Sequence, residues 1–109
     1  MNSELGLTIS KINLFLDDVR VPADVTTIHL PDIEWVVVRT QDEFKSHILR
    51  EGMPAVLSLD YNLADNKTSY HSVIWLKQLC SHYNIDIPPI FIHSSNPLGV
   101  ALLTNVLHA

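Results

Sequence analysis

Three aspartates stand where two apolar segments of the chain end. Asp17 and Asp18 follow the segment 12–16, and Asp60 follows the segment 55–59. Short apolar segments of this kind are typical of buried strands. Carboxylates that gather in one place repel each other unless a cation or a proton compensates them. Because a hard divalent cation such as Mg²⁺ prefers oxygen ligands, we predict a metal site at Asp17, Asp18 and Asp60. Taken alone, the Asp17-Asp18 pair equally fits a solvated strand end followed by a turn.

Further polar residues follow the apolar segment 90–92 and the aspartate pair. His93 titrates near neutral pH and suits a general acid or base, although a structural histidine at a strand end is the alternative. Asn96 and Pro97 predict a helix start, whose free N–H groups favour an anion as well as a cap. Arg20 fits a phosphate contact or a surface pair with a neighbouring carboxylate.

The elements that must position these residues alternate between strand and helix. Strands are predicted at 12–16, 35–38, 55–59 and 90–93, and helices at 40–51, 72–83 and 97–107. The segment 19–33 contains two prolines and lacks a helical apolar face, so we expect an irregular crossover with at most a short helical turn. Alternating strands and helices indicate a parallel sheet with right-handed crossovers, commonly in the order 2-1-3-4. We therefore predict a doubly wound α/β fold in which the ends of the first and third strands are neighbours.

Composition limits the classes of function. With 109 residues the chain is one domain, 1–109, and its net charge of −5 argues against a broad basic surface for nucleic acid. A nucleotide or a short RNA end in a small site stays compatible with that charge. Cys80 is the single cysteine, and neither a signal peptide nor an apolar segment of roughly 20 residues is recognisable. We expect a cytoplasmic protein without membrane contact.

The aspartates at the ends of the first and third strands resemble the receiver domains of two-component response regulators. This resemblance implies a receiver-like (flavodoxin-like, CheY-like) three-layer sandwich. It implies that Asp17 and Asp18 hold Mg²⁺, that Asp60 takes the position of the phosphoryl acceptor, and that Ser94 stands near the family's hydroxyl residue. Receivers also have a fifth strand ending in a lysine. Here the last lysine is Lys77, inside a predicted helix, so the resemblance implies a truncated four-stranded form.

Three motifs give a narrower resemblance. The segment 17–22 resembles DDxRxP, the segment 59–63 resembles a variant of LDHDL, and the segment 93–99 resembles HSxNPxG. Together they resemble a receiver-like family of bacteria and phages that is proposed to process cyclic phosphates. Tyr61 and Asn62 replace the family's His and Asp, which removes one acid/base group and one carboxylate.

These observations lead to three hypotheses. The first is a metal-dependent hydrolase of phosphoesters or cyclic phosphates, which acts on a phosphorylated small molecule or a nucleic-acid end. In this hypothesis Asp60 attacks the phosphate or orients water, and His93 moves a proton. Arg20 and Asn96 bind the substrate. The second is a non-catalytic receiver-like module that binds a protein partner. The third is a phosphoacceptor receiver. In each case the apolar last helix and the open edge of the fourth strand lead us to expect a homodimer.

Overall fold

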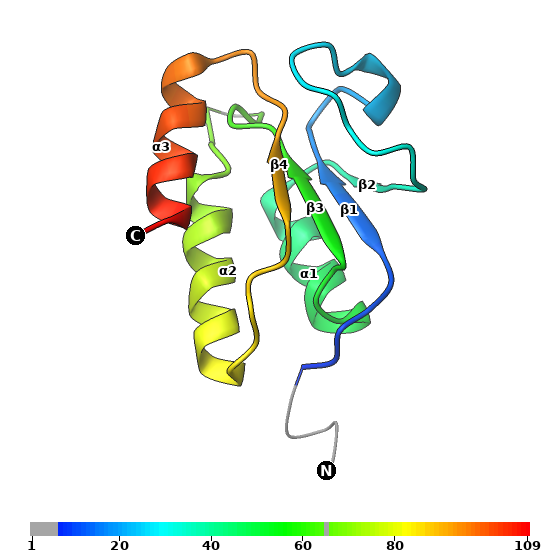
Figure 1. The fold of residues 1–109 in the computed structure, drawn as a ribbon, viewed down its shortest axis with the longest axis vertical. Helices are drawn as coiled ribbons and strands as arrows, with labels where there is room; N and C mark the ends of the chain where they lie inside the picture. Colours follow the sequence, from blue (N-terminus) through cyan, green and yellow to red (C-terminus); the bar gives the residue numbers. More distant parts are fainter. Residues whose placement is uncertain (1–6, 65) are drawn as a thin grey trace.

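The computed structural model describes residues 7–64 and 66–109. Its centre is a four-stranded parallel sheet of order β2-β1-β3-β4, as predicted (Figure 1). The strands are β1 (Asn13–Leu16), β2 (Val36–Val38), β3 (Val56–Leu59) and β4 (Ile90–Ile92). All four carboxyl ends therefore lie at one edge of the sheet, the upper edge in Figure 1.

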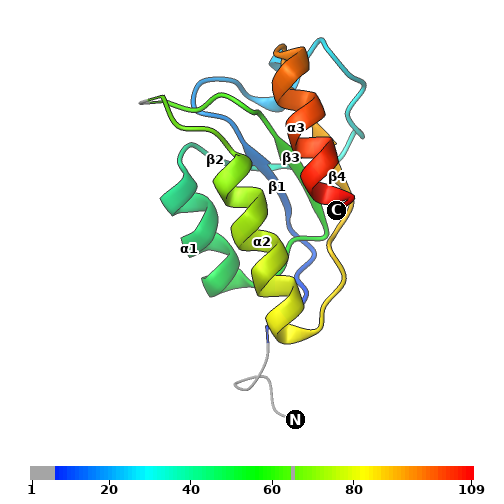
Figure 2. The same cartoon turned by 90° about the vertical axis from the view of Figure 1, so that its left-hand side faces the viewer.

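Three helices cover one face of the sheet: α1 (Gln41–Glu51), α2 (Tyr70–Tyr83) and α3 (Pro97–Leu107), all in front of the strands in Figure 2. Alternate strand residues face these helices, because successive side chains of a strand point to opposite sides. Leu14, Leu16, Leu57 and Leu59 are among them and are fully buried in the core.

The opposite face carries the residues between these leucines. Phe15 and Ser58 are fully buried there and lie opposite each other in the β1–β3 register. The crossover from β1 to β2 lies on this side, with a single short helical turn, η2 (Pro22–Asp24), as expected. Trp35, at the end of the crossover, meets the Phe15 ring edge-on, with 6.2 Å between centroids. The helices, the sheet and the crossover form three layers.

Local signals explain where the helices begin and end. The Thr40 hydroxyl caps α1 by accepting the Glu43 N–H at 3.1 Å, whereas the Glu43 carboxylate accepts the N–H of Arg39 rather than that of Thr40. Gly52 ends α1 with a φ of 103°, a conformation that suits glycine. In contrast, α2 begins at Tyr70, two residues before the predicted start. Its N-cap residue, Ser69, makes no side-chain capping hydrogen bond.

Within the described residues, no helix has both the length and the apolar character needed to cross a membrane.

Candidate metal and phosphate site

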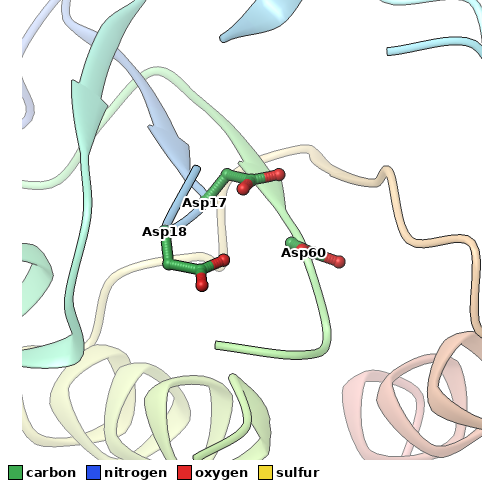
Figure 3. Close-up of side chains that lie close together, drawn as sticks. All are labelled: Asp17, Asp18 and Asp60. Atoms are coloured by element: carbon green, nitrogen blue, oxygen red, sulfur yellow. The ribbon is translucent and has the colours of Figure 1, made fainter. Parts of the chain in front are cut away.

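The carboxyl ends of β1 and β3 bring the three predicted aspartates together (Figure 3). Leu16 and Leu59 are register partners, so the next residues, Asp17 and Asp60, emerge side by side, and the Asp60 N–H donates to the Leu16 carbonyl at 3.0 Å. One carboxylate oxygen each of Asp17, Asp18 and Asp60 lies within 4.8 Å of the others. The sheet order alone therefore makes the cluster.

Arg20 lies across two of these carboxylates. Its Nε is 3.2 Å from Asp17 Oδ2, and its Nη2 is 3.3 Å from Asp60 Oδ2. The turn that returns Arg20 to the cluster is held by Asp17 itself, whose Oδ1 accepts the N–H groups of Val19 and Arg20 at 3.0 and 2.9 Å. Arg20 thus pairs with the neighbouring carboxylates, and its side chain stays 29% exposed.

The environment separates the two buried carboxyl groups. Burial raises the pKa of Asp17. Hydrogen bonds from the backbone N–H groups of Arg20 and Val19, together with His93, lower the pKa by more, so that the net pKa is below the ordinary value. For Asp60, burial and then the negative charge of Asp17 raise the pKa, and the Arg20 charge only partly opposes them. Asp17 therefore keeps its negative charge more readily than an ordinary aspartate, and Asp60 is the more readily protonated of the two.

The donor set fits a divalent cation. Three carboxylate oxygens converge among the described residues, as hard cations prefer, and the guanidinium of Arg20 already places positive charge against two of these carboxylates. A bound cation would be held by Asp17, Asp18 and Asp60.

His93 is fully buried on the sheet face opposite the helices. Its Nε2 lies 3.0 Å from Asp17 Oδ2, its Nδ1 contacts the Ser58 hydroxyl, and its ring stacks on Phe15 with 4.2 Å between centroids and 5° between planes. Burial outweighs the attraction of Asp17 and lowers the pKa of His93 to about 4, so the ring is neutral at neutral pH. This geometry is that of a histidine fixed inside the fold, the alternative that the sequence left open.

Ser94 and Asn96 form the opposite wall. The Ser94 hydroxyl oxygen accepts the Asn96 N–H at 3.1 Å, and the Ser94 side chain lies near enough to Asp60 to oppose the rise in the pKa of that carboxyl group. The Asn96 side chain caps α3 by accepting the Gly99 N–H at 3.2 Å and donates to Asn62 Oδ1 at 3.2 Å. Among the described residues, the side-chain hydrogen bonds of Asn96 go to Asn62 and α3, whereas Ser94 reaches the cluster.

Three contributors went unnoticed in the sequence. Arg39, at the end of β2, donates from Nη1 to the carbonyls of Asp17 and Arg20, at 3.3 and 2.7 Å, and so braces the turn between them. Its place after a strand was the available signal. Ser58 was marked only as a hydroxyl inside an apolar strand. Phe15 carried no signal, because a buried aromatic residue is ordinary in a core strand.

The two departures from the LDHDL motif have clear places. Tyr61 packs its ring against Gly99, so closely that a Cβ at residue 99 would overlap the ring. Asn62 is exposed, and its Oδ1 accepts a hydrogen bond from the Asn96 side chain. Lys77 lies on α2 and donates to the carbonyl oxygens of Val106 and Ala109, at the far end of α3 from Asn96.

Comparison with protein families agrees with this geometry. The model of the family described as "Cyclic-phosphate processing Receiver domain" matches residues 12–109. The chain belongs to this family. The match runs from β1 to α3 and confirms the resemblance drawn from the three motifs. Neither the curated proteins nor the solved structures gave a match to the chain.

Proposed function

We propose that this receiver domain hydrolyses cyclic phosphates, carried by a phosphorylated small molecule or a nucleic-acid end, with the help of a divalent cation. The observation that carries the proposal is the convergence of Asp17, Asp18 and Asp60 around Arg20, in a chain of the cyclic-phosphate processing family.

Each residue has a role that its surroundings support. Asp17, Asp18 and Asp60 hold the cation, and when bound, Mg²⁺ neutralises negative charge on the phosphate oxygens. Arg20 contacts the phosphate, because its guanidinium is partly exposed and held at the mouth of the cluster. Ser94, whose side chain lowers the pKa of Asp60, helps to orient its carboxylate. A direct contact between Asn96 and substrate stays a prediction, since both ends of its amide are already engaged.

Asp60 is the group that accepts a proton. In the reaction a water oxygen bonds to phosphorus, and one ring P–O bond breaks. The water proton passes to Asp60 and then to the released ester oxygen, which becomes a hydroxyl. One water is consumed, and the product is a phosphomonoester. Without the ion, burial and Asp17 raise the pKa of this carboxyl group, which offsets part of the lowering that a bound cation would cause.

The decisive experiment incubates the protein and Mg²⁺ with 2′,3′-cyclic nucleotides and with short RNAs that end in a cyclic phosphate. We expect a phosphomonoester from at least one of them, and none from Asp60→Asn or after chelation by EDTA. A folded protein that turns over none of these substrates would sink the proposal for this substrate class.

We also infer a homodimer, whether the chain is a hydrolase or a partner-binding module, and a different surface favours it. On α3, Leu98 is 70% and Leu102 39% exposed, and within the described residues β4 pairs on one side only, with β3. Sedimentation at tens of micromolar tests it: a dimer mass that returns to one chain in Leu98→Lys supports the homodimer, and a wild-type monomer excludes it.

A further inference from the structure

We propose that Ser58 is a positioning residue, which donates to Nδ1 of His93 and thereby holds the ring whose Nε2–H orients the Asp17 carboxylate. The proposal rests on the proposed function only in taking Asp17 as a metal ligand. The role of His93 in it is to position Asp17 rather than to act on the substrate.

The first step is the assignment of protons along the chain of contacts. A carboxylate only accepts hydrogen bonds, so the close approach of His93 Nε2 to Asp17 Oδ2 at 3.0 Å requires the proton on Nε2. A neutral imidazole then has no proton on Nδ1, which must accept. The Ser58 hydroxyl, in contact with Nδ1, is therefore the donor. Asp17 sets the tautomer, and Ser58 supplies the donor that Nδ1 of this tautomer requires.

The second step is the constraint on the ring. Ser58, His93 and Asp17 are all fully buried, and the Phe15 ring lies parallel to the imidazole at 4.2 Å. Stacking fixes the ring plane, and the two hydrogen bonds fix its rotation within that plane. Both ring nitrogens of His93 are engaged and its side chain is fully buried, so His93 has no free atom to present to a substrate at the aspartate cluster.

The third step is what this does to Asp17. Its Oδ1 accepts two backbone N–H groups, and its Oδ2 accepts from His93. Both oxygens are therefore held from the protein side, and the remaining capacity of Oδ2 faces Arg20 and the aspartate cluster. Hydrogen-bonding partners of this kind around metal ligands commonly affect affinity by 10–100-fold.

The origin of the arrangement is the sheet itself. Ser58 in β3 lies between Phe15 of β1 and Phe91 of β4 in the register, so a hydroxyl at this position reaches the residue that follows β4. An alanine would leave the packing nearly unchanged but would remove the donor.

The first measurement is the histidine tautomer, read from ¹⁵N chemical shifts of wild-type protein without metal. We expect a neutral ring with the proton on Nε2 in the wild type and in Ser58→Ala, and in Ser58→Ala a shifted Nδ1 resonance that reports the loss of its hydrogen-bond donor. A proton on Nδ1 in the wild type would overturn the proposal without the need for any variant.

The second measurement is the affinity for Mg²⁺ itself, by calorimetry, with Mn²⁺ and electron paramagnetic resonance as a check. We expect Ser58→Ala to weaken binding roughly tenfold or more, and Ser58→Thr, which keeps the hydroxyl, to recover most of it. Ser72→Ala is the matched control, because Ser72 is also buried and its hydroxyl has no hydrogen-bond partner among the described residues.

The outcomes separate this proposal from the proposed function. Equal affinity for Mg²⁺ and an unchanged Nδ1 shift in Ser58→Ala, or an equal loss of affinity in Ser72→Ala, would overturn the positioning role. A protein that binds Mg²⁺ through Asp17 but opens no cyclic phosphate would overturn the proposed substrate class and leave the positioning role standing. If the wild type binds no divalent ion, the tautomer alone decides.

Discussion

Acidification should destabilise this fold through His93. The pKa of its ring falls from the ordinary 6.5 to about 4 in the folded protein, because burial disfavours the charged form. Between these two pH values the unfolded chain binds a proton that the folded chain does not, so the free energy of unfolding falls as the pH falls. The gap from 6.5 to 4, at ~1.36 kcal/mol for each pKa unit, gives about 3 kcal/mol lost between pH 7 and pH 4.

Urea denaturation without divalent ions, at several pH values from 7 to 4, measures this loss. For a urea slope of about 1.5 kcal/mol per M, the midpoint of the wild type should fall by about 2 M. His93→Gln is the matched variant, because its amide can still donate to Asp17 but does not titrate. Subtracting its pH profile also removes the contribution of His47, whose pKa is likewise lowered by burial. Parallel profiles for the two proteins would refute a buried neutral His93.

Three further predictions concern the cluster and its neighbours. Arg20→Gln removes a positive charge that competes with a metal ion, so the affinity for Mg²⁺ in calorimetry should rise roughly fivefold, about 1 kcal/mol after allowance for solvent screening. Unchanged or weaker binding would contradict this competition. The control is Arg50→Gln, because Arg50 forms an exposed ion pair with Glu51. Asp18→Asn should weaken Mg²⁺ binding at least tenfold with little change in thermal stability, because Asp18 is only partly buried; a large fall in melting temperature would instead assign it a structural role. Chelation of Mg²⁺ should lower the melting temperature of the wild type but not that of Asp60→Asn, and an equal fall in both would place the ion elsewhere.

The sequence was sufficient for the elements that place the aspartates. Apolar strands that stop at Asp17 and Asp60, together with the common order of such sheets, correctly placed these residues side by side. The start of α3 at Pro97 was predicted correctly from Asn96, and the Asn96 side chain does cap this helix. The predicted start of α2 was two residues late, and the N-cap residue Ser69 makes no side-chain capping bond there.

The contacts inside the site could not be predicted from the sequence. Arg20 was expected to bind a phosphate or pair with a carboxylate, but its span of two carboxylates depends on a turn held by Asp17 and braced by Arg39. The surroundings of His93 depend on residues from β1 and β3 that lie 35 or more positions away in the chain. No spacing rule connects such residues, because the sheet register alone brings them together.

The packing of Tyr61 against Gly99 adds a steric link between two segments that Asn62 and Asn96 also join by a hydrogen bond. Because a side chain at residue 99 would occupy the space of the Tyr61 ring, the two positions cannot vary independently. Relatives with a large ring after the strand-end aspartate should retain glycine in the first turn of α3, and relatives with a small residue there can accept alanine. The substitution of histidine by tyrosine in this chain is thus conditional on the glycine of the third motif, so two motifs that read as separate signatures are under one steric constraint.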